Sequence, residues 1–251
     1  MQLKSYLRLA KYAAKSRVLS LSPAVYWRAR KLLKGHGEPE LKLVPVLCRK
    51  DSTAVDIGAH FGMYSYWMRE HSAEVHAFEP VPRLAKVLAA GHRRDGRVSV
   101  HEGALSATTG EATLRAPIAG LGRSTIEVSN ALEGMKDPTV TIDERSVTTW
   151  TLDEFELQRV ALIKIDVEGH EESALQGALA TLAKWRPALI VELEERHNPG
   201  CIERVTQLLA PLGYERYQFD GRRLVPRVTP QRHNFLFLQP GHVEAIGRTL
   251  V

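Results

Sequence analysis

Cysteine is scarce in this chain of 251 residues, since Cys48 and Cys201 are the only two and stand far apart. A disulfide framework is therefore not expected, and two thiols cannot complete a closed zinc site by themselves. Long apolar runs are also missing, because no stretch approaches the roughly 20 residues needed to cross a bilayer. Basic residues are scattered through residues 1–21, unlike the uninterrupted apolar block of a secretory signal. These absences predict a reduced, cytoplasmic protein.

Acidic residues are slightly outnumbered, with 29 Asp and Glu against 34 Lys and Arg, for a net charge of +5. The composition is otherwise that of a globular domain, at 44% hydrophobic and 25% charged residues. The positive excess is diffuse, apart from the N-terminus and a group formed by Arg222, Arg223, Arg227 and Arg232. A basic enzyme surface therefore explains the charge better than a dedicated nucleic-acid or membrane surface does.

Residues 1–50 differ from the rest and are interpreted as an N-terminal helical extension. Apolar residues recur at helical spacing over residues 6–14 with basic residues between them, and Pro23 to Lys34 forms a second helical stretch. Such a helix could make weak peripheral contact with a membrane surface. We favour the other interpretation, a helical brace packed on the main domain, which we assign to residues 51–251.

Beyond residue 51, segments with strand and helix patterns alternate. Strands are predicted at 54–57, 74–78, 97–101, 161–165 and 188–193, and helices at 63–71, 82–93, 171–183 and 201–212. Segments 214–219 and 234–238 resemble a terminal antiparallel pair. This order predicts an α/β, Rossmann-like fold with a mostly parallel seven-stranded sheet and a terminal antiparallel strand. Residues 104–150 interrupt the alternation and are predicted to add strands and a loop at 118–138.

The first predicted strand runs into the segment Asp56-Ile57-Gly58-Ala59-His60-Phe61-Gly62, which opens a helix. Gly58 permits a tight turn, and Gly62 would let the helix begin close to a ligand. The spacing departs from the G-x-G-x-x-G pattern that presents bare amides to a pyrophosphate. S-adenosylmethionine has no phosphate and carries a sulfonium and an ammonium group, so the acidic Asp56 suits it better.

The second predicted strand ends in Glu79-Pro80, about 20 residues after Gly58. In this architecture an acidic residue at that position accepts hydrogen bonds from ribose hydroxyls. Ala104 and Leu105 follow the third strand, where the adenine would lie. The predicted cofactor site consists of Asp56, Gly58, Ala59, His60, Phe61, Gly62, Glu79, Pro80, Ala104, Leu105 and Asp166.

A third polar segment, Lys164 to Glu171, ends the fourth strand of the alternation. The carboxyl ends of parallel strands share one edge, so this segment should face the same crevice as Asp56 and Glu79. We predict Asp166, Glu168 and His170 as catalytic residues that deprotonate or orient a hydroxyl acceptor. No metal is required by this scheme. If a divalent cation were involved, Asp166, Glu168 and Glu192 would be its ligands.

Taken together, these segments resemble the FkbM family of methyltransferases. The resemblance covers roughly residues 38–238 and is carried by Val55 to Gly62, Phe78 to Pro80, Thr151 to Phe155, Ile163 to Glu171 and Ile190 to Glu192. It implies a class I methyltransferase fold, S-adenosylmethionine as donor and O-methylation of a hydroxyl on a sugar or secondary metabolite.

By position, the resemblance places the methionine part on Asp56, Gly58 and Gly62, the ribose on Glu79 and the reaction centre at residues 166–170. Acceptor recognition would vary in the loop that contains Arg123, Ser124 and Thr125. The resemblance leaves the acceptor and the oligomeric state open.

Three other interpretations fit the sequence less well. A nicotinamide-dependent oxidoreductase should carry G-x-G-x-x-G and a Tyr-Lys pair, and a base amino-methyltransferase an Asn/Asp-Pro-Pro-Tyr/Phe motif, none of which occurs. A non-catalytic binding protein with this fold should have lost the acidic strand ends, which are all present. We therefore expect a small-molecule or glycan acceptor with a hydroxyl, and no nucleic acid.

Overall fold

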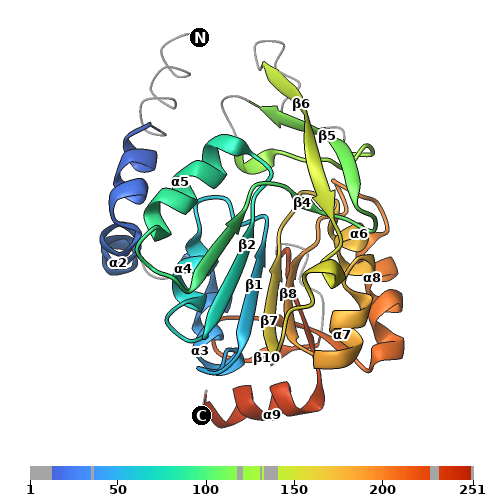
Figure 1. Cartoon of the computed structure of the whole chain (residues 1–251). Coiled ribbons are helices and arrows are strands. Elements are labelled where there is room, and N and C mark those ends of the chain that lie inside the picture. The colour runs from blue at the N-terminus through green and yellow to red at the C-terminus, as the bar shows by residue number, and fades with distance from the viewer. Residues whose placement is uncertain are drawn as a thin grey trace.

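The central feature of the protein, in a computed structural model, is a twisted sheet with helices on both faces (Figure 1). The structure describes residues 13–34, 37–117, 121–130, 132, 141–226 and 232–249. Its main sheet has the strand order β10-β9-β11-β8-β7-β1-β2-β3. These strands are β1 (Thr53–Ile57), β2 (Glu74–Phe78), β3 (Val98–His101), β7 (Val160–Ile165), β8 (Ala188–Glu192), β9 (Glu215–Phe219), β10 (Leu224–Val225) and β11 (Asn234–Leu238).

The strand directions give the Rossmann-like α/β fold. Strand β1 pairs in parallel with both β2 and β7, and β8 continues in parallel beyond β7. Strand β11 is antiparallel to β8 and to β9, which confirms the predicted terminal antiparallel strand. The sheet has one strand more than the seven predicted, because the two-residue β10 adds to the edge of β9. A strand so short carries no hydrophobic pattern that the sequence could reveal.

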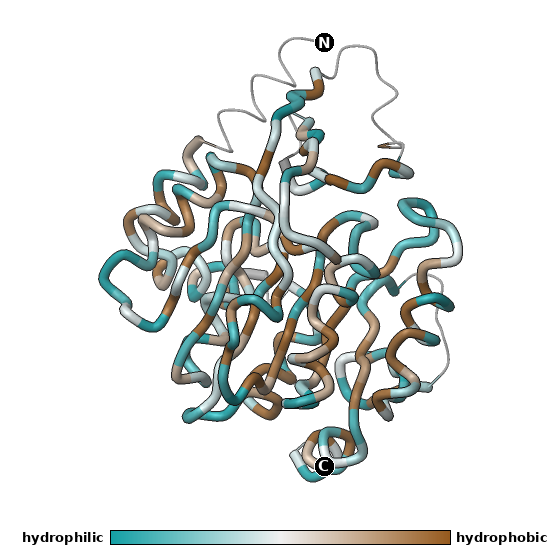
Figure 2. The backbone as a smooth tube through the Cα atoms, turned by 45° about the vertical axis from the view of Figure 1, so that its right-hand side comes forward, coloured by the Kyte–Doolittle hydropathy of each residue, from teal (hydrophilic) through white to brown (hydrophobic). Residues whose placement is uncertain are grey.

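The inner strands are apolar because both of their faces are buried. Val55 and Ile57 of β1 pack toward α6 (Glu171–Gln176), α7 (Leu179–Trp185) and α8 (Cys201–Leu209). Ala54 faces the other side, where α3 (Val44–Leu47), α4 (Met63–Met68) and α9 (Pro240–Thr249) lie, and α5 (Pro82–His92) covers β2 and β3 there. Figure 2 shows the apolar stretches concentrated in the sheet and polar residues at its loops.

The N-terminal extension braces the main domain. Residues 13–21 and α2 (Pro23–Lys34) are helical and place Leu19 and Trp27 in a buried cluster with Phe61 and Tyr66. The described part of the extension thus packs on the main domain, as a brace would. The rest of the predicted first helix, up to residue 12, lies outside the described residues. Within the described part of the chain, no helix is long and apolar enough to cross a membrane.

The predicted insertion forms its own three-stranded sheet, of β4 (Ala104–Leu105), β5 (Gly110–Pro117) and β6 (Ile142–Trp150), in the order β4-β6-β5. Figure 1 places it beyond the carboxyl ends of β1, β2 and β7. The segment from η2 (Leu121–Arg123) to residue 130 pairs with β5 through Arg115 and Thr125. Residues 118–120, 131 and 133–140 of the predicted loop lie outside the described residues, as does Arg227.

One predicted helix is two helices. The segment predicted as a single helix at 171–183 breaks between α6 and α7 at Gly177. A side chain at Gly177 would place its Cβ 2.0 Å from the carbonyl oxygen of Ser106, so the loop after β4 passes directly over this point. Three short 3-10 helices also occur among the described residues: η1 (Pro39–Lys42), η3 (Asp153–Phe155) and η4 (Ala210–Leu212).

Candidate active site

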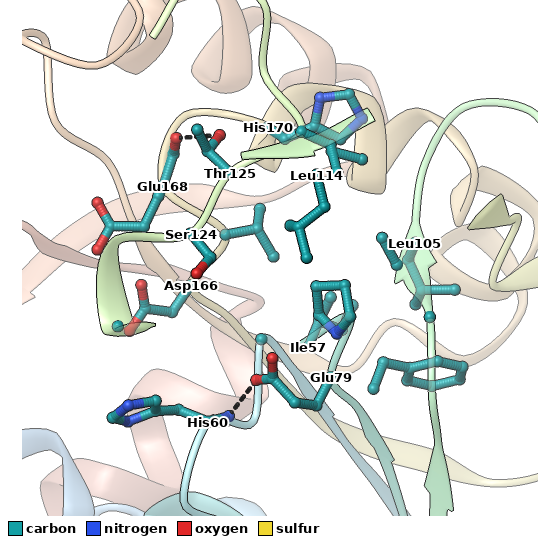
Figure 3. A pocket seen from close by; sticks show the side chains of 18 residues that line it. Ile57, His60, Glu79, Leu105, Leu114, Ser124, Thr125, Asp166, Glu168 and His170 are labelled. Atoms are coloured by element: carbon teal, nitrogen blue, oxygen red, sulfur yellow. Dashed lines mark hydrogen bonds between the residues drawn. The ribbon is translucent and has the colours of Figure 1, made fainter. Parts of the chain in front are cut away.

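A cavity, the main cavity, opens at the carboxyl ends of β1, β2 and β7 and beneath the inserted segment (Figure 3). It gathers nine of the predicted site residues: Gly58, His60, Glu79, Pro80, Ala104, Leu105, Asp166, Glu168 and His170. Its wall is apolar on the side of Ile57, Leu105 and Leu114 and acidic on the side of Glu79, Asp166 and Glu168. The combination of an apolar wall and a few convergent polar groups is typical of a cofactor site.

Gly58 lies in the wall of the cavity, where the ends of β1 and β7 meet. Its φ of +77° is in the left-handed region, and a Cβ there would meet the Asp166 carbonyl oxygen at 1.9 Å. The backbones after β1 and β7 are also joined directly, because the Asp166 amide donates to the Ile57 carbonyl at 3.0 Å. Glycine is therefore required here so that the two acidic strand ends can come together.

Asp56 is 2% exposed and does not line the main cavity. Its Oδ2 accepts hydrogen bonds from the Ser65 amide at 2.7 Å and from the Ser65 hydroxyl at 2.5 Å. Burial raises the pKa of Asp56 to about 6. Asp56 thus holds the loop to α4, and any contribution to ligand binding passes through the loop or through the neighbouring cavity that it lines.

Phe61 and Gly62 do not line the main cavity either. Phe61 packs in the buried cluster with the N-terminal helices. A Cβ on Gly62 would meet Leu88 Cδ1 at 2.3 Å, so this glycine brings α4 close to α5. Ala59 lines only the neighbouring cavity. The cofactor contacts predicted for these three residues are therefore not in the main cavity, although the turn that they form shapes it.

Glu79 ends β2 and is 4% exposed. Its two carboxylate oxygens accept hydrogen bonds from the amides of His60 at 2.7 Å and Val81 at 2.8 Å. Figure 3 shows the carboxylate at the cavity wall beside His60. Burial raises the pKa of Glu79 to about 7. Each oxygen keeps a second lone pair, so this fixed carboxylate can also accept from a ligand hydroxyl.

Asp166 is the most open carboxylate of the cluster, with 34% of its side chain exposed. Its Oδ2 lies 3.7 Å from the ammonium of Lys164, which is 1% exposed. Although burial disfavours the Lys164 charge, the carboxylates of Asp166 and Glu192 raise its pKa above the usual value. Lys164 thus places a buried positive charge beside the Asp166 carboxylate.

Glu168 and Glu192 are the acids most strongly affected by their surroundings. Burial and then the charge of Asp166 raise the pKa of Glu168 to about 8. Burial and the same neighbour also raise the pKa of Glu192. Glu168 has a φ of +54°, an unusual conformation for a residue with a side chain, and its Oε2 lies 3.2 Å from His197 Nδ1. Such concentrated strain and proton affinity are typical of functional sites.

His170 lines the cavity, but both of its ring nitrogens have partners. Nδ1 lies 3.0 Å from Glu127 Oε2, and Nε2 lies 3.0 Å from the Ser106 hydroxyl. In this arrangement neither nitrogen is available to a substrate proton. His170 thereby joins the inserted segment to the loop after β4, and its catalytic role stays a prediction.

The inserted segment is held over the reaction centre by further bonds. The hydroxyl of Thr125 and the side-chain amide of Asn130 donate to the Glu168 carbonyl, at 2.9 Å and 2.6 Å. Gly122, Ser124, Thr125 and Ile126 of this segment line the cavity. Of these, the sequence pointed only to Ser124 and Thr125, as part of a variable loop.

The alternative metal site has no support in the described part of the chain. No group of three or more His, Cys, Asp or Glu side chains there has a geometry that could hold a metal ion. Asp166, Glu168 and Glu192 therefore do not form such a group.

Comparison with known proteins identifies the family of the chain. The profile of the family described as "Methyltransferase FkbM domain" matches residues 56–219, more than half of the chain. The chain belongs to the FkbM methyltransferase family. This FkbM protein is 28% identical over 202 residues to the hexuronic acid methyltransferase AglP of Haloferax volcanii, across 79% of this chain and 77% of that protein.

Among solved structures, the FkbM chain is similar to methyltransferase FkbM from Methylobacillus flagellatus KT, with a TM-score of 0.51 and 16% identity. The alignment covers 90% of this chain but only 59% of that one, so the chain spans less than two thirds of the solved protein. At this identity the likeness establishes the fold. Both the resemblance and the class I methyltransferase fold expected from the sequence are confirmed.

Proposed function

We propose that the protein transfers a methyl group from S-adenosylmethionine to a hydroxyl oxygen of a sugar, with a glycan that contains a hexuronic acid as the first candidate. The observation that carries the proposal is the main cavity, in which Glu79, Asp166 and Glu168 converge beside an apolar wall in a chain of a methyltransferase family. The similarity to a hexuronic acid methyltransferase supports the sugar class.

The residues present fit the cofactor. Adenosylmethionine, when bound, supplies an electrophilic methyl group on a sulfonium. Glu79 would accept hydrogen bonds from the ribose hydroxyls, and Ala104 and Leu105 would contact the adenine. The acidic side of the cavity, with Asp166 at its centre, suits the positive charge of the sulfonium.

The chemical step requires in-line approach of the acceptor oxygen and removal of its proton. The new bond forms between that oxygen and the methyl carbon while the carbon–sulfur bond breaks, and the hydroxyl proton passes to a carboxylate. Asp166 is the best placed acceptor because its side chain is open to the cavity and lies beside the buried ammonium of Lys164. The inserted segment lies beside this point, where Thr125 and Asn130 donate to the Glu168 carbonyl.

Incubation of the full chain with methyl-labelled adenosylmethionine and a panel of acceptors tests the proposal. The panel contains an oligosaccharide with hexuronic acid, its neutral hexose counterpart and RNA. We expect label in the hexuronic acid oligosaccharide, one S-adenosylhomocysteine formed per methyl group, and a methyl ether by NMR. Label in RNA, or no transfer to either sugar, would contradict the proposal, and a methyl ester would place the transfer on the carboxylate instead.

The raised proton affinity of the acidic cluster gives a pH signature. Glu168 is protonated below its pKa of about 8 and ionised above it, and only the ionised form attracts a sulfonium. Adenosylmethionine should therefore bind increasingly well as pH rises from 6 to 8, by up to about tenfold per unit for each proton released. S-adenosylhomocysteine has the same ammonium and carboxylate but no sulfonium, so its affinity should change less.

Calorimetric titration of both ligands between pH 6 and pH 9 measures the difference between the two slopes. Glu168→Gln, which cannot titrate, should reduce that difference. If the affinities of the two ligands for the wild type changed with pH in parallel, no carboxyl group with a raised pKa would lie near the sulfonium.

A further inference from the structure

A second cavity lies next to the main one, between the N-terminal helices and the turn after β1. The two cavities share Gly58, His60 and Asp166 in their walls. The outer wall of the second cavity comes from the extension: Lys15 from the helix at residues 13–21, and Trp27 and Arg30 from α2. This outer wall lies outside residues 56–219, the part of the chain that matches the family.

Lys15 is a partly buried cation in this wall. Its Nζ lies 3.8 Å from the ring centroid of Phe61 and 5.8 Å from that of Trp27. Burial, and then the positive charge of Arg30, lower the pKa of Lys15 to about 8. Two cations are therefore held near each other at a cost that an anion between them would relieve.

Neither cation is neutralised within the described part of the chain. No carboxylate there lies within ion-pair distance of Lys15 or Arg30. The Arg30 guanidinium donates to the sulfur of Met63 at 3.6 Å, a weak acceptor. These two side chains thus keep most of their donor capacity for a ligand.

The indole of Trp27 adds a third donor. Trp27 is 4% exposed, and its Nε1 has no hydrogen-bond partner among the described residues. An N–H group buried without an acceptor costs on the order of 1–3 kcal/mol, and an acceptor on a ligand would relieve that cost. Two unpaired cations and one unpaired donor in a single wall match a carboxylate.

The opposite wall is acidic and already partly satisfied. Glu38 Oε2 accepts hydrogen bonds from the Tyr64 hydroxyl at 2.8 Å and from the Asn234 side chain at 3.3 Å. On this side of the cavity the acidic residues Glu38, Asp56 and Asp166 outnumber the cation Lys164, whereas Lys15 and Arg30 make the other side positive. An anion is therefore directed to the N-terminal helices.

We propose that Lys15, Trp27 and Arg30 form a carboxylate-binding subsite through which the N-terminal helices hold a ligand in the active site. The assignment rests on the proposed function. That function offers two sources for the carboxylate: the amino-acid end of the cofactor and a hexuronate of the acceptor. The same side chains and the same charge complementarity serve either source.

The test compares Lys15→Gln, Arg30→Gln and Trp27→Phe with the wild type by calorimetric titration. Trp27→Phe keeps the ring and removes only the N–H donor. Arg28→Gln is the matched control, because Arg28 is on the same helix but pairs with Glu70 at the surface. The two probes are S-adenosylhomocysteine and 5′-methylthioadenosine, which has the same adenosine and thioether but no amino-acid group.

If the carboxylate is that of the cofactor, Lys15→Gln and Arg30→Gln should each bind S-adenosylhomocysteine at least tenfold more weakly than the wild type. Their affinity for 5′-methylthioadenosine should be unchanged. Trp27→Phe should lower the affinity for S-adenosylhomocysteine about threefold to tenfold. Arg28→Gln should leave the affinity for both ligands unchanged. If the carboxylate is that of the acceptor, S-adenosylhomocysteine affinity should stay unchanged. In saturation-transfer NMR, the wild type saturated with S-adenosylhomocysteine should then bind D-glucuronate. Lys15→Gln and Arg30→Gln, saturated in the same way, should not bind it.

D-glucose is the neutral reference in the NMR arm and should bind equally to wild type and variants. Unchanged affinity for S-adenosylhomocysteine together with absent or unchanged D-glucuronate binding would overturn the subsite. Failure of the wild type to bind S-adenosylhomocysteine would overturn the proposed function and the subsite with it. The two failures are therefore distinguishable.

Discussion

Asp166→Asn should lower kcat by about 10²- to 10⁴-fold, the range that a positioned proton acceptor contributes. The substitution keeps the size of the side chain and removes only its charge and basicity. Because Asp166 lines both cavities beside Lys164, no other open carboxylate in the described chain has the same access. S-adenosylhomocysteine should still bind within about threefold of the wild type, since the predicted ribose and adenine contacts are untouched.

Asp51→Asn is the matched control for this experiment. Asp51 lies two residues before β1, at the opposite end of the strand from Asp166, and pairs with Arg49 at the surface. The Asp51→Asn variant should keep the wild-type kcat and the wild-type affinity for S-adenosylhomocysteine. Single-turnover kinetics and calorimetry separate the two effects, and a kcat near that of wild type in Asp166→Asn would exclude Asp166 as the proton acceptor.

Glu79→Ala should weaken binding of S-adenosylhomocysteine by about 100-fold. Hydrogen bonds to a charged acceptor contribute roughly 1.5–3 kcal/mol each, and a ribose offers two hydroxyls to one carboxylate. The variant also leaves the amides of His60 and Val81 without their acceptor, which loosens the turn at the cavity wall. Glu79→Gln retains one acceptor oxygen and should fall between wild type and Ala.

Glu74→Ala serves as the control, because Glu74 lies at the exposed start of the same strand. Thermal unfolding shows whether Glu79→Ala is folded when its affinity is measured. A folded Glu79→Ala variant with wild-type affinity would exclude Glu79 from the cofactor site.

The acidic strand ends were predictable because their position depends on local patterns. A buried strand followed by Asp56 and Gly58, and another followed by Glu79, determine where parallel strands must expose their carboxyl ends. The sequence could not show that the Asp56 carboxylate would accept hydrogen bonds from the amide and hydroxyl of Ser65 in α4. A carboxylate at a strand end suits a ligand or a backbone amide equally well.

The inserted segment was the least predictable part of the site. It has no regular periodicity, and its position depends on long-range partners such as Arg115 with Thr125 and Thr125 with the Glu168 carbonyl. His170 illustrates the same limit, because the segment 164–171 predicts a reactive histidine. Its partners Glu127 and Ser106, however, are 43 and 64 residues away in sequence.

A crystal structure of the full chain with S-adenosylhomocysteine tests the central claim most directly. We predict the ribose hydroxyls within hydrogen-bond distance of the Glu79 carboxylate and the thioether sulfur in contact with the strand end at Gly58 and Asp166. A ligand bound with its ribose away from Glu79, or outside the main cavity altogether, would contradict it.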